Sequence, residues 1–328
     1  MVVLVTGATG FLGSHLVRAL GPGNVVATGR NSQALAVLAA LGIKTVRLDL
    51  AHPVPAADRD RIGPVCAVVH CAGLSSPWGT QTAFEAANVE ATRHIADLAQ
   101  ELGAKRLVFV STASVYFQYK DQDNLAEHQI AAHFVNAYAR TKYLAEQEVL
   151  ARAALNPLVL RPRGIYGAGD TALLPRLMRV AARGPIPRFA PSGATDITHV
   201  DDVVAACRAA LDAAPDVAGE VVNISGGVGV PLVDIIAAAC EATGVTPRWR
   251  TLPFAPAFAA ARALEQGARL LPRQPEPPVT AYALGILRYR QTLDISKAKR
   301  LLGWAPGVSF AEGVQRTFAD GAMRRGVL

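Results

Sequence analysis

The chain has 328 residues, of which 51% are hydrophobic and 18% charged, so it can form a large buried core and is not a disordered chain. Its net charge of +7 comes from scattered arginines rather than a basic run between aromatic residues. This pattern favours a small anionic ligand and argues against nucleic acid. No stretch reaches the roughly 18 uninterrupted apolar residues of a membrane-spanning helix.

The first 20 residues predict a buried strand at 2–5, a turn with Gly7, Gly10 and Gly13, and a helix. Glycines in such a turn let the backbone approach a pyrophosphate at the positive end of the helix dipole. The spacing of three and three differs from the two and three of the usual dinucleotide fingerprint. We expect a nucleotide to contact Gly7, Gly10, Phe11, Leu12 and Gly13.

Strands and helices alternate as far as residue 161. Apolar runs predict further strands at 24–28, 43–48, 65–70, 106–111 and 158–161, and helical periodicity predicts helices at 33–41, 83–102 and 138–153. Uninterrupted valine, leucine and isoleucine runs fit strands covered on both faces. The pattern predicts an α/β fold, a Rossmann-type doubly wound parallel sheet.

Glycine and proline become frequent after Arg163, which indicates a smaller, irregular α/β C-terminal substrate region. Within it we expect a helix at 200–211 and a strand at 220–224 that returns to the sheet. The remaining expected elements are helices at 230–243, 254–271, 294–302 and 310–322 and an extended proline-rich segment at 272–278. The predicted division is an NADP-binding Rossmann domain at 1–165, with 199–224 returning to it, and a substrate-binding region at 166–198 and 225–328.

The residues after the second strand bear on the choice of cofactor. An acidic residue normally holds the adenosine ribose about 20 residues past the glycines, yet none lies between Gly13 and Asp49. Arg30, with Asn31 and Ser32, stands there instead, and a guanidinium suits a 2′-phosphate. NADP(H) is therefore favoured over NAD(H), although Arg30 can also be a solvated strand end.

Two further strand ends are candidate cofactor contacts. Asp49 and Leu50 end the third strand and are expected to flank adenine, although Asp49 can equally be a turn residue. Cys71, Ala72 and Gly73 follow the fourth strand, and their small size suits a close approach of backbone to cofactor.

Tyr138 and Lys142 are four residues apart on the predicted helix, which places both side chains on one face. A nearby ammonium lowers the pKa of a tyrosine and makes it a usable general acid or base. The spacing is common by chance, and it gains weight because the segment follows the fifth strand with its Ser111 and Thr112.

Five motifs in this order resemble the extended short-chain dehydrogenase/reductases of the NAD(P)-dependent epimerase/dehydratase superfamily: Gly7-x-x-Gly10-x-x-Gly13, Ser111-Thr112-x-x-Val115-Tyr116, Tyr138-x-x-x-Lys142, Arg161-Pro162-x-x-x-Tyr166-Gly167 and His199-Val200-Asp201-Asp202-Val203. The resemblance implies that Thr112 hydrogen-bonds the substrate oxygen, Tyr138 moves the proton, and Lys142 holds the nicotinamide ribose and tunes Tyr138. Asn88 and Pro162 match further positions on the cofactor side, Asn88 as structural support.

Segments 76–79, 114–117 and 289–304 resemble the 3β-hydroxysteroid dehydrogenase-like branch, which includes bacterial 2-alkyl-3-oxoalkanoate reductases. That resemblance implies hydride transfer between a nicotinamide and a ketone or secondary alcohol on a hydrophobic substrate, and with the preference for NADP(H) drawn from Arg30 the expected activity is that of an NADPH-dependent reductase. Thr112 replaces the serine common in the steroid enzymes. Expected substrate contacts are Ser75, Trp78, Ser114 and Arg163.

Two alternatives stay open. A nucleotide-sugar 4-epimerase with tightly bound NAD would share the cofactor motifs and could use these arginines for a diphosphate: Arg176, Arg179, Arg183, Arg188 and Arg248. A non-catalytic NADP-binding sensor would not need Thr112, Tyr138 and Lys142 together. A sugar dehydratase is disfavoured because Ala113 and Ser114 stand where an Asp-Glu pair is expected.

Partners and location follow from a few further features. The helix at 254–271 is expected to be amphipathic, either packed on its own domain or forming a peripheral membrane contact. The resemblance implies a homodimer through the helices that begin at Ala83 and Tyr138. The cysteines lack paired metal-ligand spacing, which favours reduced thiols in a cytoplasmic protein and no metal site: Cys66, Cys71, Cys207 and Cys240.

Overall fold

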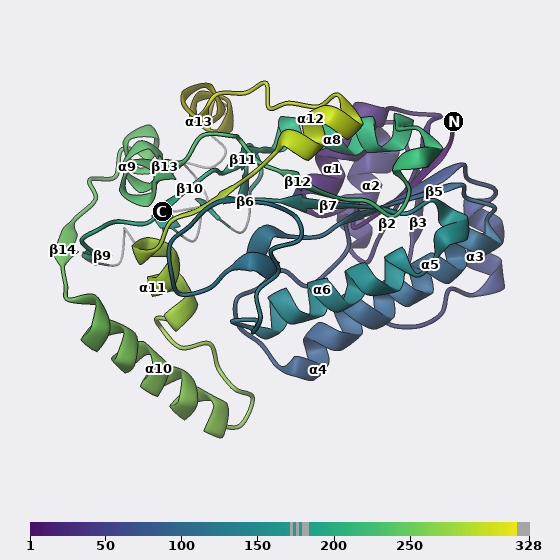
Figure 1. Ribbon diagram of the computed structural model, residues 1–328. Coiled ribbons are helices and arrows are strands. Elements are labelled where there is room, and N and C mark those ends of the chain that lie inside the picture. The colour runs from purple at the N-terminus through teal and green to yellow at the C-terminus, as the bar shows by residue number, and fades with distance from the viewer. Residues whose placement is uncertain (171–172, 175–176, 179–183, 320–328) are drawn as a thin grey trace.

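A computed structural model describes residues 1–170, 173–174, 177–178 and 184–319, and its centre is a seven-stranded parallel sheet (Figure 1). The strand order is β12-β7-β5-β4-β1-β2-β3. The strands are β1 (Val3–Thr6), β2 (Val25–Gly29), β3 (Lys44–Arg47), β4 (Ala67–His70), β5 (Arg106–Val110), β7 (Leu158–Pro162) and β12 (Val221–Ile224). The predicted α/β fold is confirmed, and the segment expected to return to the sheet is its edge strand β12.

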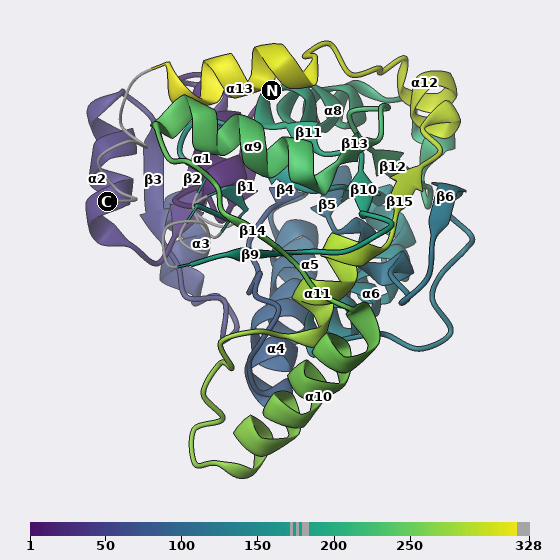
Figure 2. The same ribbon diagram turned by 90° about the vertical axis from the view of Figure 1, so that its left-hand side faces the viewer.

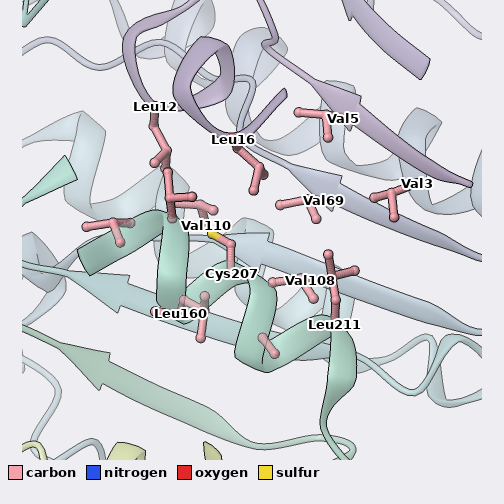
Figure 3. Close-up of a cluster of buried hydrophobic side chains, with 14 of the residues drawn as sticks. Val3, Val5, Leu12, Leu16, Val69, Val108, Val110, Leu160, Cys207 and Leu211 are labelled. Atoms are coloured by element: carbon pink, nitrogen blue, oxygen red, sulfur yellow. The ribbon is translucent and has the colours of Figure 1, made fainter. Parts of the chain in front are cut away.

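Helices cover both faces of this sheet (Figure 2). One face carries α1 (Phe11–Leu20), α2 (Ser32–Ala40), α8 (Val200–Asp212) and α12 (Ser296–Leu302), and the other carries α3 (Ala56–Ile62), α5 (Ala91–Glu101) and α6 (Ala137–Leu150). Successive residues of a strand point to opposite faces of the sheet. Val3 and Val5 belong to the cluster between the sheet and helices α1 and α8, whereas Leu4 belongs to the cluster between the sheet and helices α5 and α6. Figure 3 shows the first cluster, in which side chains of α1 and α8 meet the sheet.

The helix expected at 83–102 is present and contains a wider turn. It consists of α4 (Gln81–Phe84), a π-helical turn, η1 (Glu85–Glu90), and α5. The Thr92 hydroxyl donates to the Asn88 carbonyl at 2.6 Å, and the Asn88 side chain bonds to neighbouring segments. Helical periodicity did not reveal this wider turn, because side-chain contacts to distant parts of the chain hold it.

In the described part of the chain, three small sheets lie beyond the main sheet. Their strands are β6 (Gln122–Leu125), β8 (Ile165–Tyr166), β9 (Ile186–Arg188), β10 (Ala194–Thr195), β11 (Thr198–His199), β13 (Val230–Pro231), β14 (Trp249–Thr251) and β15 (Gln291–Leu293). The 3-10 turns are η2 (Ala113–Tyr116), η3 (Ala153–Leu155) and η4 (Pro215–Val217). Most of these strands are only two to four residues long and pair with partners far away in sequence, which is why the sequence did not predict them.

Helices α9 (Leu232–Thr243), α10 (Phe254–Leu270), α11 (Ala281–Arg288) and α13 (Phe310–Phe318) complete the C-terminal part. The expected helix at 230–243 begins two residues later than predicted, as does the one at 294–302, and the predicted end of the last helix at 322 lies outside the described residues. Within the described residues, no helix is long and apolar enough to cross a membrane. In that same part of the chain, no group of three or more histidine, cysteine, aspartate or glutamate side chains could hold a metal ion.

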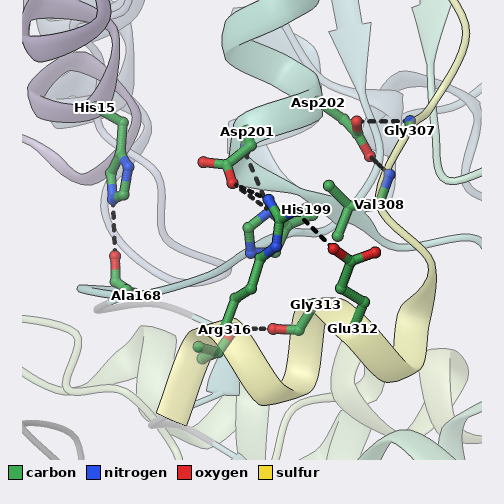
Figure 4. A network of polar contacts seen from close by, with 11 residues as sticks. His15, Ala168, His199, Asp201, Asp202, Gly307, Val308, Glu312, Gly313 and Arg316 are labelled. Atoms are coloured by element: carbon green, nitrogen blue, oxygen red, sulfur yellow. Dashed lines mark hydrogen bonds and ion pairs between the residues drawn. The ribbon is translucent and has the colours of Figure 1, made fainter. Parts of the chain in front are cut away.

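Polar contacts fasten the last helix to the body of the protein (Figure 4). Arg316 of α13 donates to Asp201 at 2.9 Å and to Glu312 at 2.6 Å. At the start of α8, the Asp202 carboxylate accepts from the backbone N–H groups of Gly307 and Val308. The His-Val-Asp-Asp-Val segment therefore joins the C-terminal segment to α8, which packs on the main sheet.

Candidate active site

The glycine turn forms a close-fitting backbone cradle. Gly7 has φ of 66°, and a Cβ there would lie 2.7 Å from the backbone nitrogen of Ala72. A Cβ at Gly13 would overlap the Gly7 carbonyl. Gly10 begins α1 without a side-chain cap, and the first turn of α1 carries no acidic residue. The cradle suits a pyrophosphate, because the glycines hold the backbone close together and the first N–H groups of a helix, here those of Phe11 and Leu12, have no partner within the helix.

The three residues expected at a 2′-phosphate follow β2. Arg30 and Ser32 are exposed, and Asn31 caps α2 by accepting from the Ala34 N–H at 3.1 Å. The Arg47 guanidinium on β3 donates to the Arg30 carbonyl at 3.2 Å, which brings a second cation to this strand end. Sequence reasoning missed Arg47, because its place depends on the register of β3 against β2, which pairs it with Gly29.

At the carboxyl end of β3, Asp49 has the turn contact that was the open alternative to a place beside adenine. Its carboxylate accepts from the Ala51 N–H at 3.1 Å. Leu50 is half-buried, and its carbonyl accepts from His94 at 2.9 Å. Both residues lie at the carboxyl end of β3, on the same side of the sheet as the glycine turn.

Cys71, Ala72 and Gly73 follow β4 and face the cradle. A Cβ at Gly73 would lie 3.0 Å from Asn88 Oδ1 and 3.9 Å from Lys142 Nζ, so glycine leaves space beside the lysine. Burial raises the pKa of the Cys71 thiol to about 12, although Lys142 acts in the opposite direction, so the thiol stays protonated. Cys71 is therefore a small packing residue here rather than a nucleophile.

Asn88 ties three segments together from the π-helical turn. Its Oδ1 accepts from the Leu74 N–H at 2.7 Å, and its Nδ2 donates to the Thr141 hydroxyl at 3.0 Å. Thr141 precedes Lys142 on α6. The expected supporting role of Asn88 thus has a geometric basis in the loop after β4 and the helix that carries Tyr138.

Lys142 is buried and fixed. Its Nζ donates to the Val110 carbonyl at 2.7 Å and lies 4.0 Å above the Phe109 ring. Burial lowers the pKa of Lys142 to about 8, while Glu146 raises it. His70 lies close by, bonded to Thr6 and Thr92, and burial together with Lys142 lowers its pKa to about 3, so it is neutral.

The pKa of Tyr138 is shifted in the direction opposite to the one expected. Burial raises the pKa of Tyr138, and the hydroxyls of Thr112 and Ser75 act in the opposite direction through hydrogen bonds. The ammonium of Lys142, expected to lower this pKa, donates to a backbone carbonyl instead. Tyr138 is therefore a protonated phenol at neutral pH, suited to giving a proton away.

Thr112 and Ser114 form a hydroxyl pair at the end of β5. Thr112 Oγ1 donates to Ser114 Oγ at 3.1 Å and accepts from the Ser114 N–H at 3.1 Å. Tyr282 OH of α11 lies 3.3 Å from Ser114 Oγ. Sequence reasoning missed Tyr282, which is 168 residues away from Ser114 and belongs to no motif that we singled out.

A buried ion pair lies behind these hydroxyls. Arg161 donates to both carboxylate oxygens of Glu146, at 2.9 and 2.5 Å, and Ser111 also donates to Glu146. Arg161 further donates to the Tyr116 hydroxyl at 2.7 Å, which in turn donates to Asn223 at 2.6 Å. Because Ser111, Glu146 and Arg161 adjoin the segments that carry the site, this network fixes β5, α6 and β7 relative to one another.

The other expected substrate contacts, Ser75, Trp78 and Arg163, lie in different surroundings. Ser75 lies at Tyr138, and Trp78 Nε1 donates to the Gln274 carbonyl at 2.8 Å, which connects the loop after β4 to the segment between α10 and α11. Arg163 is buried and donates to Thr195 at 2.7 Å, next to Pro162 at the end of β7. Of the arginines considered for a diphosphate, Arg188 and Arg248 are exposed, and the others lie outside the described residues: Arg176, Arg179 and Arg183.

Residues 3–225 match the NAD dependent epimerase/dehydratase family. The chain belongs to this family. The match spans every strand of the main sheet as well as Tyr138 and Lys142. The family assignment therefore covers both the glycine cradle and the hydroxyl site, which consists of the side chains of Ser75, Thr112 and Tyr138.

The similarity to individual proteins covers more of the chain than the family match does. A 2-alkyl-3-oxoalkanoate reductase of Stenotrophomonas maltophilia (strain K279a) is 32% identical over 332 residues, which cover 98% of this chain and 100% of the relative. A decarboxylating sterol-4-alpha-carboxylate 3-dehydrogenase of Saccharomyces cerevisiae (strain ATCC 204508 / S288c) is 28% identical and covers 97% of both chains. The UDP-glucuronic acid 4-epimerase from Bacillus cereus in complex with NAD has a TM-score of 0.74 at 22% identity, covering 97% of this chain and 96% of the other, which shows the shared fold.

The family and these relatives confirm the resemblance to the extended short-chain dehydrogenase/reductases and to their 3β-hydroxysteroid dehydrogenase-like branch. The chain is an oxidoreductase that acts on CH–OH groups, in a family that depends on a nicotinamide dinucleotide.

Proposed function

We propose that the chain is an NADPH-dependent reductase that converts the ketone of a hydrophobic substrate, a 3-oxo acid or a steroid-like ketone, to a secondary alcohol. The convergence of the Thr112, Ser75 and Tyr138 hydroxyls, with the fixed Lys142 one turn along α6 from Tyr138, carries the proposal. The relatives' names describe proteins that act on 2-alkyl-3-oxoalkanoates and sterol-4-alpha-carboxylates. In both names a carboxylate stands on the carbon next to the reacting carbon.

The proposed roles follow from the contacts. The bound nicotinamide would supply a hydride to the ketone carbon. Thr112 and Tyr138 donate hydrogen bonds to the ketone oxygen, and Tyr138 gives its proton to that oxygen, so that hydride and proton together complete the alcohol. The raised pKa of Tyr138 keeps this proton in place for reduction. Lys142, held by Val110 next to Gly73, would hold a ribose hydroxyl.

The proposed cofactor preference rests on Arg30 and its neighbour Arg47. Their guanidiniums, with Asn31 and Ser32, would hold a 2′-phosphate, while Asp49 and Leu50 border the adenine. Arg30→Ala should raise the Michaelis constant for NADPH about tenfold, as expected for the loss of a charge-assisted hydrogen bond, and leave that for NADH unchanged. Arg61→Ala, an exposed arginine paired with Asp58 on α3, is the control. Equal changes with both cofactors would contradict the preference.

The proposal divides the chain into the nucleotide-binding part, 1–165 with 199–224, and the substrate-binding part, 166–198 and 225–328.

We also propose a homodimer through α5 and α6, and peripheral membrane contact through α10 and the residue after it, where leucines are exposed: Leu264, Leu270 and Leu271. Analytical ultracentrifugation tests the dimer. Liposome co-sedimentation of the wild type and a variant with these leucines replaced by serine tests the contact, and cell fractionation tests the proposed cytoplasmic location.

The deciding experiment measures NADPH oxidation with 3-oxo acids, steroid ketones and UDP-sugars. We expect turnover with a 3-oxo acid or steroid ketone and none with UDP-sugars. Conversion of a UDP-sugar to its 4-epimer without net NADPH consumption would favour an epimerase. A protein that binds NADPH and turns over no substrate of any class would favour a sensor.

A further inference from the structure

Ser114 and Tyr282 extend the hydroxyl site beyond the pair assigned to the reacting oxygen. Ser114 Oγ lies 3.1 Å from Thr112 Oγ1 and 3.3 Å from Tyr282 OH, so three hydroxyls form a chain that leads away from Thr112. Ser114 is 7% exposed and Thr112 8%. Tyr282 is also close enough to Tyr138 to affect its titration. Two protein segments far apart in sequence thus meet at one group of hydroxyls.

Several contacts fix the Tyr282 ring. The Ala281 N–H, at the start of α11, donates to Glu265 of α10 at 2.8 Å, and Thr280 caps the helix. The Tyr282 ring meets the Phe117 ring edge-on, with centroids 5.2 Å apart. One turn later Gly285 lies against Tyr119, where a Cβ would be 2.8 Å from the ring, so a glycine is what lets α11 come this close. The phenol is therefore held in place before any substrate arrives.

We propose that Ser114 and Tyr282 bind a second oxygen group of the substrate, a carboxylate on the carbon adjacent to the reacting carbon. This inference rests on the proposed function. In a 3-oxo acid or 3-hydroxy acid a single carbon separates the two oxygen-bearing carbons, so their oxygens lie within hydrogen-bond spacing of each other. The Thr112 and Ser114 hydroxyls have the same spacing. The first oxygen faces Thr112 and Tyr138, and the second faces Ser114 and Tyr282.

The hydrogen-bond capacities agree with this arrangement. Ser114 and Tyr282 each carry one O–H donor, and in their mutual bond only one of the two protons is used. A carboxylate accepts from both, which gives charge-assisted bonds in a partly desolvated place. With a substrate that lacks this group, Ser114 and Tyr282 stay bonded to each other and gain neither charge-assisted bond, so the site favours acids over simple alcohols.

The test compares 3-hydroxydecanoate with nonan-2-ol, which lacks the carboxylate, in oxidation by NADP⁺. The variants are Tyr282→Phe and Ser114→Ala, with Tyr289→Phe as control, since Tyr289 lies near α11 and packs on Phe254 instead. Each site variant should lower kcat/KM for 3-hydroxydecanoate about 10- to 100-fold, mainly through KM, as the loss of a hydrogen bond to a charged group predicts. The value for nonan-2-ol should change less than about threefold, and the control should match the wild type with both.

Each other outcome has a definite meaning. Equal losses with both compounds make Tyr282 and Ser114 merely structural and overturn the inference, and so does unchanged kcat/KM with both. Because Tyr282→Phe retains the ring and Ser114→Ala lies on another segment, a folding defect in one variant leaves the other to decide. If the wild type oxidises neither compound and reduces no ketone, the proposed function fails first and the inference falls with it.

Discussion

The glycine cradle and the helical hairpin at 254–288, in which helices α10 and α11 pack on each other, border the same site but are built differently. The cradle consists of strand ends and a helix start within one parallel sheet, and its contacts are backbone against backbone, as at Gly7, Gly13 and Ala72. The hairpin is attached to the rest of the protein by side chains, through Trp78 to Gln274 and Tyr282 to Ser114, and Glu265 joins its two helices to each other. Its outer surface carries exposed leucines.

This difference separates what a family shares from what distinguishes its members. Backbone contacts tolerate almost no change at the glycines but many elsewhere, so the nucleotide part can stay constant while the substrate changes. Side-chain contacts from a distant hairpin can be altered one at a time. We therefore expect substitutions in the cradle to affect all substrates alike, and substitutions in the hairpin to separate one substrate from another.

The largest effect is expected at Tyr138, between the two regions. Tyr138→Phe removes the proton donor and should lower kcat about 10²- to 10⁴-fold, as typical for general acid catalysis. NADPH affinity, measured by fluorescence titration, should stay within about twofold, because the cradle is untouched. Tyr143→Phe on the same helix, where the ring packs on Phe134, is the control. Retained turnover in Tyr138→Phe would remove this residue from the reaction.

The cradle itself is tested by Gly13→Ala. The new Cβ overlaps the Gly7 carbonyl, so the turn must shift. We expect a loss of about 1–3 kcal/mol in the free energy of unfolding and a similar relative loss of kcat/KM for every substrate tried. Urea denaturation and the two-compound assay measure these. If Gly13→Ala has the stability and cofactor affinity of the wild type, the backbone of the cradle can shift to make room for the Cβ at little cost, and the prediction is wrong.

The same contrast explains what could be predicted from the sequence. The cradle, the seven parallel strands and the Tyr138–Lys142 pair are local patterns of glycine spacing, apolar runs and helical periodicity, and all were predicted. Arg47 and Tyr282 were missed because strand register and the docking of a distant helix place them. The raised pKa of Tyr138 was missed because it depends on burial and on where the Lys142 ammonium donates, neither of which residue spacing contains.

A smaller effect is expected from the charge of Lys142. Because burial lowers its pKa from 10.5 to about 8, the native state releases this proton at a lower pH than the unfolded state does. Between pH 8 and 10 the unfolded state binds more protons, so this group makes the protein more stable as pH rises, by about 1 kcal/mol per pH unit. Thermal denaturation at several pH values should show Lys142→Met losing this slope relative to wild type. Parallel curves would mean that the lysine is not desolvated.

The smallest effect is expected in the hairpin, at Gly267 on α10. A Cβ there meets nothing within 4 Å, and the position is helical, so Gly267→Ala should stabilise the protein by about 0.5–1 kcal/mol, because alanine loses less backbone entropy in a helix. Activity should not change. The matched variant Gly285→Ala on α11 would press on Tyr119, displace Tyr282 and lower kcat/KM for 3-hydroxydecanoate more than for nonan-2-ol. If Gly267→Ala destabilises the protein instead, α10 packs against a surface absent from the single chain, and the hairpin is then as constrained as the cradle.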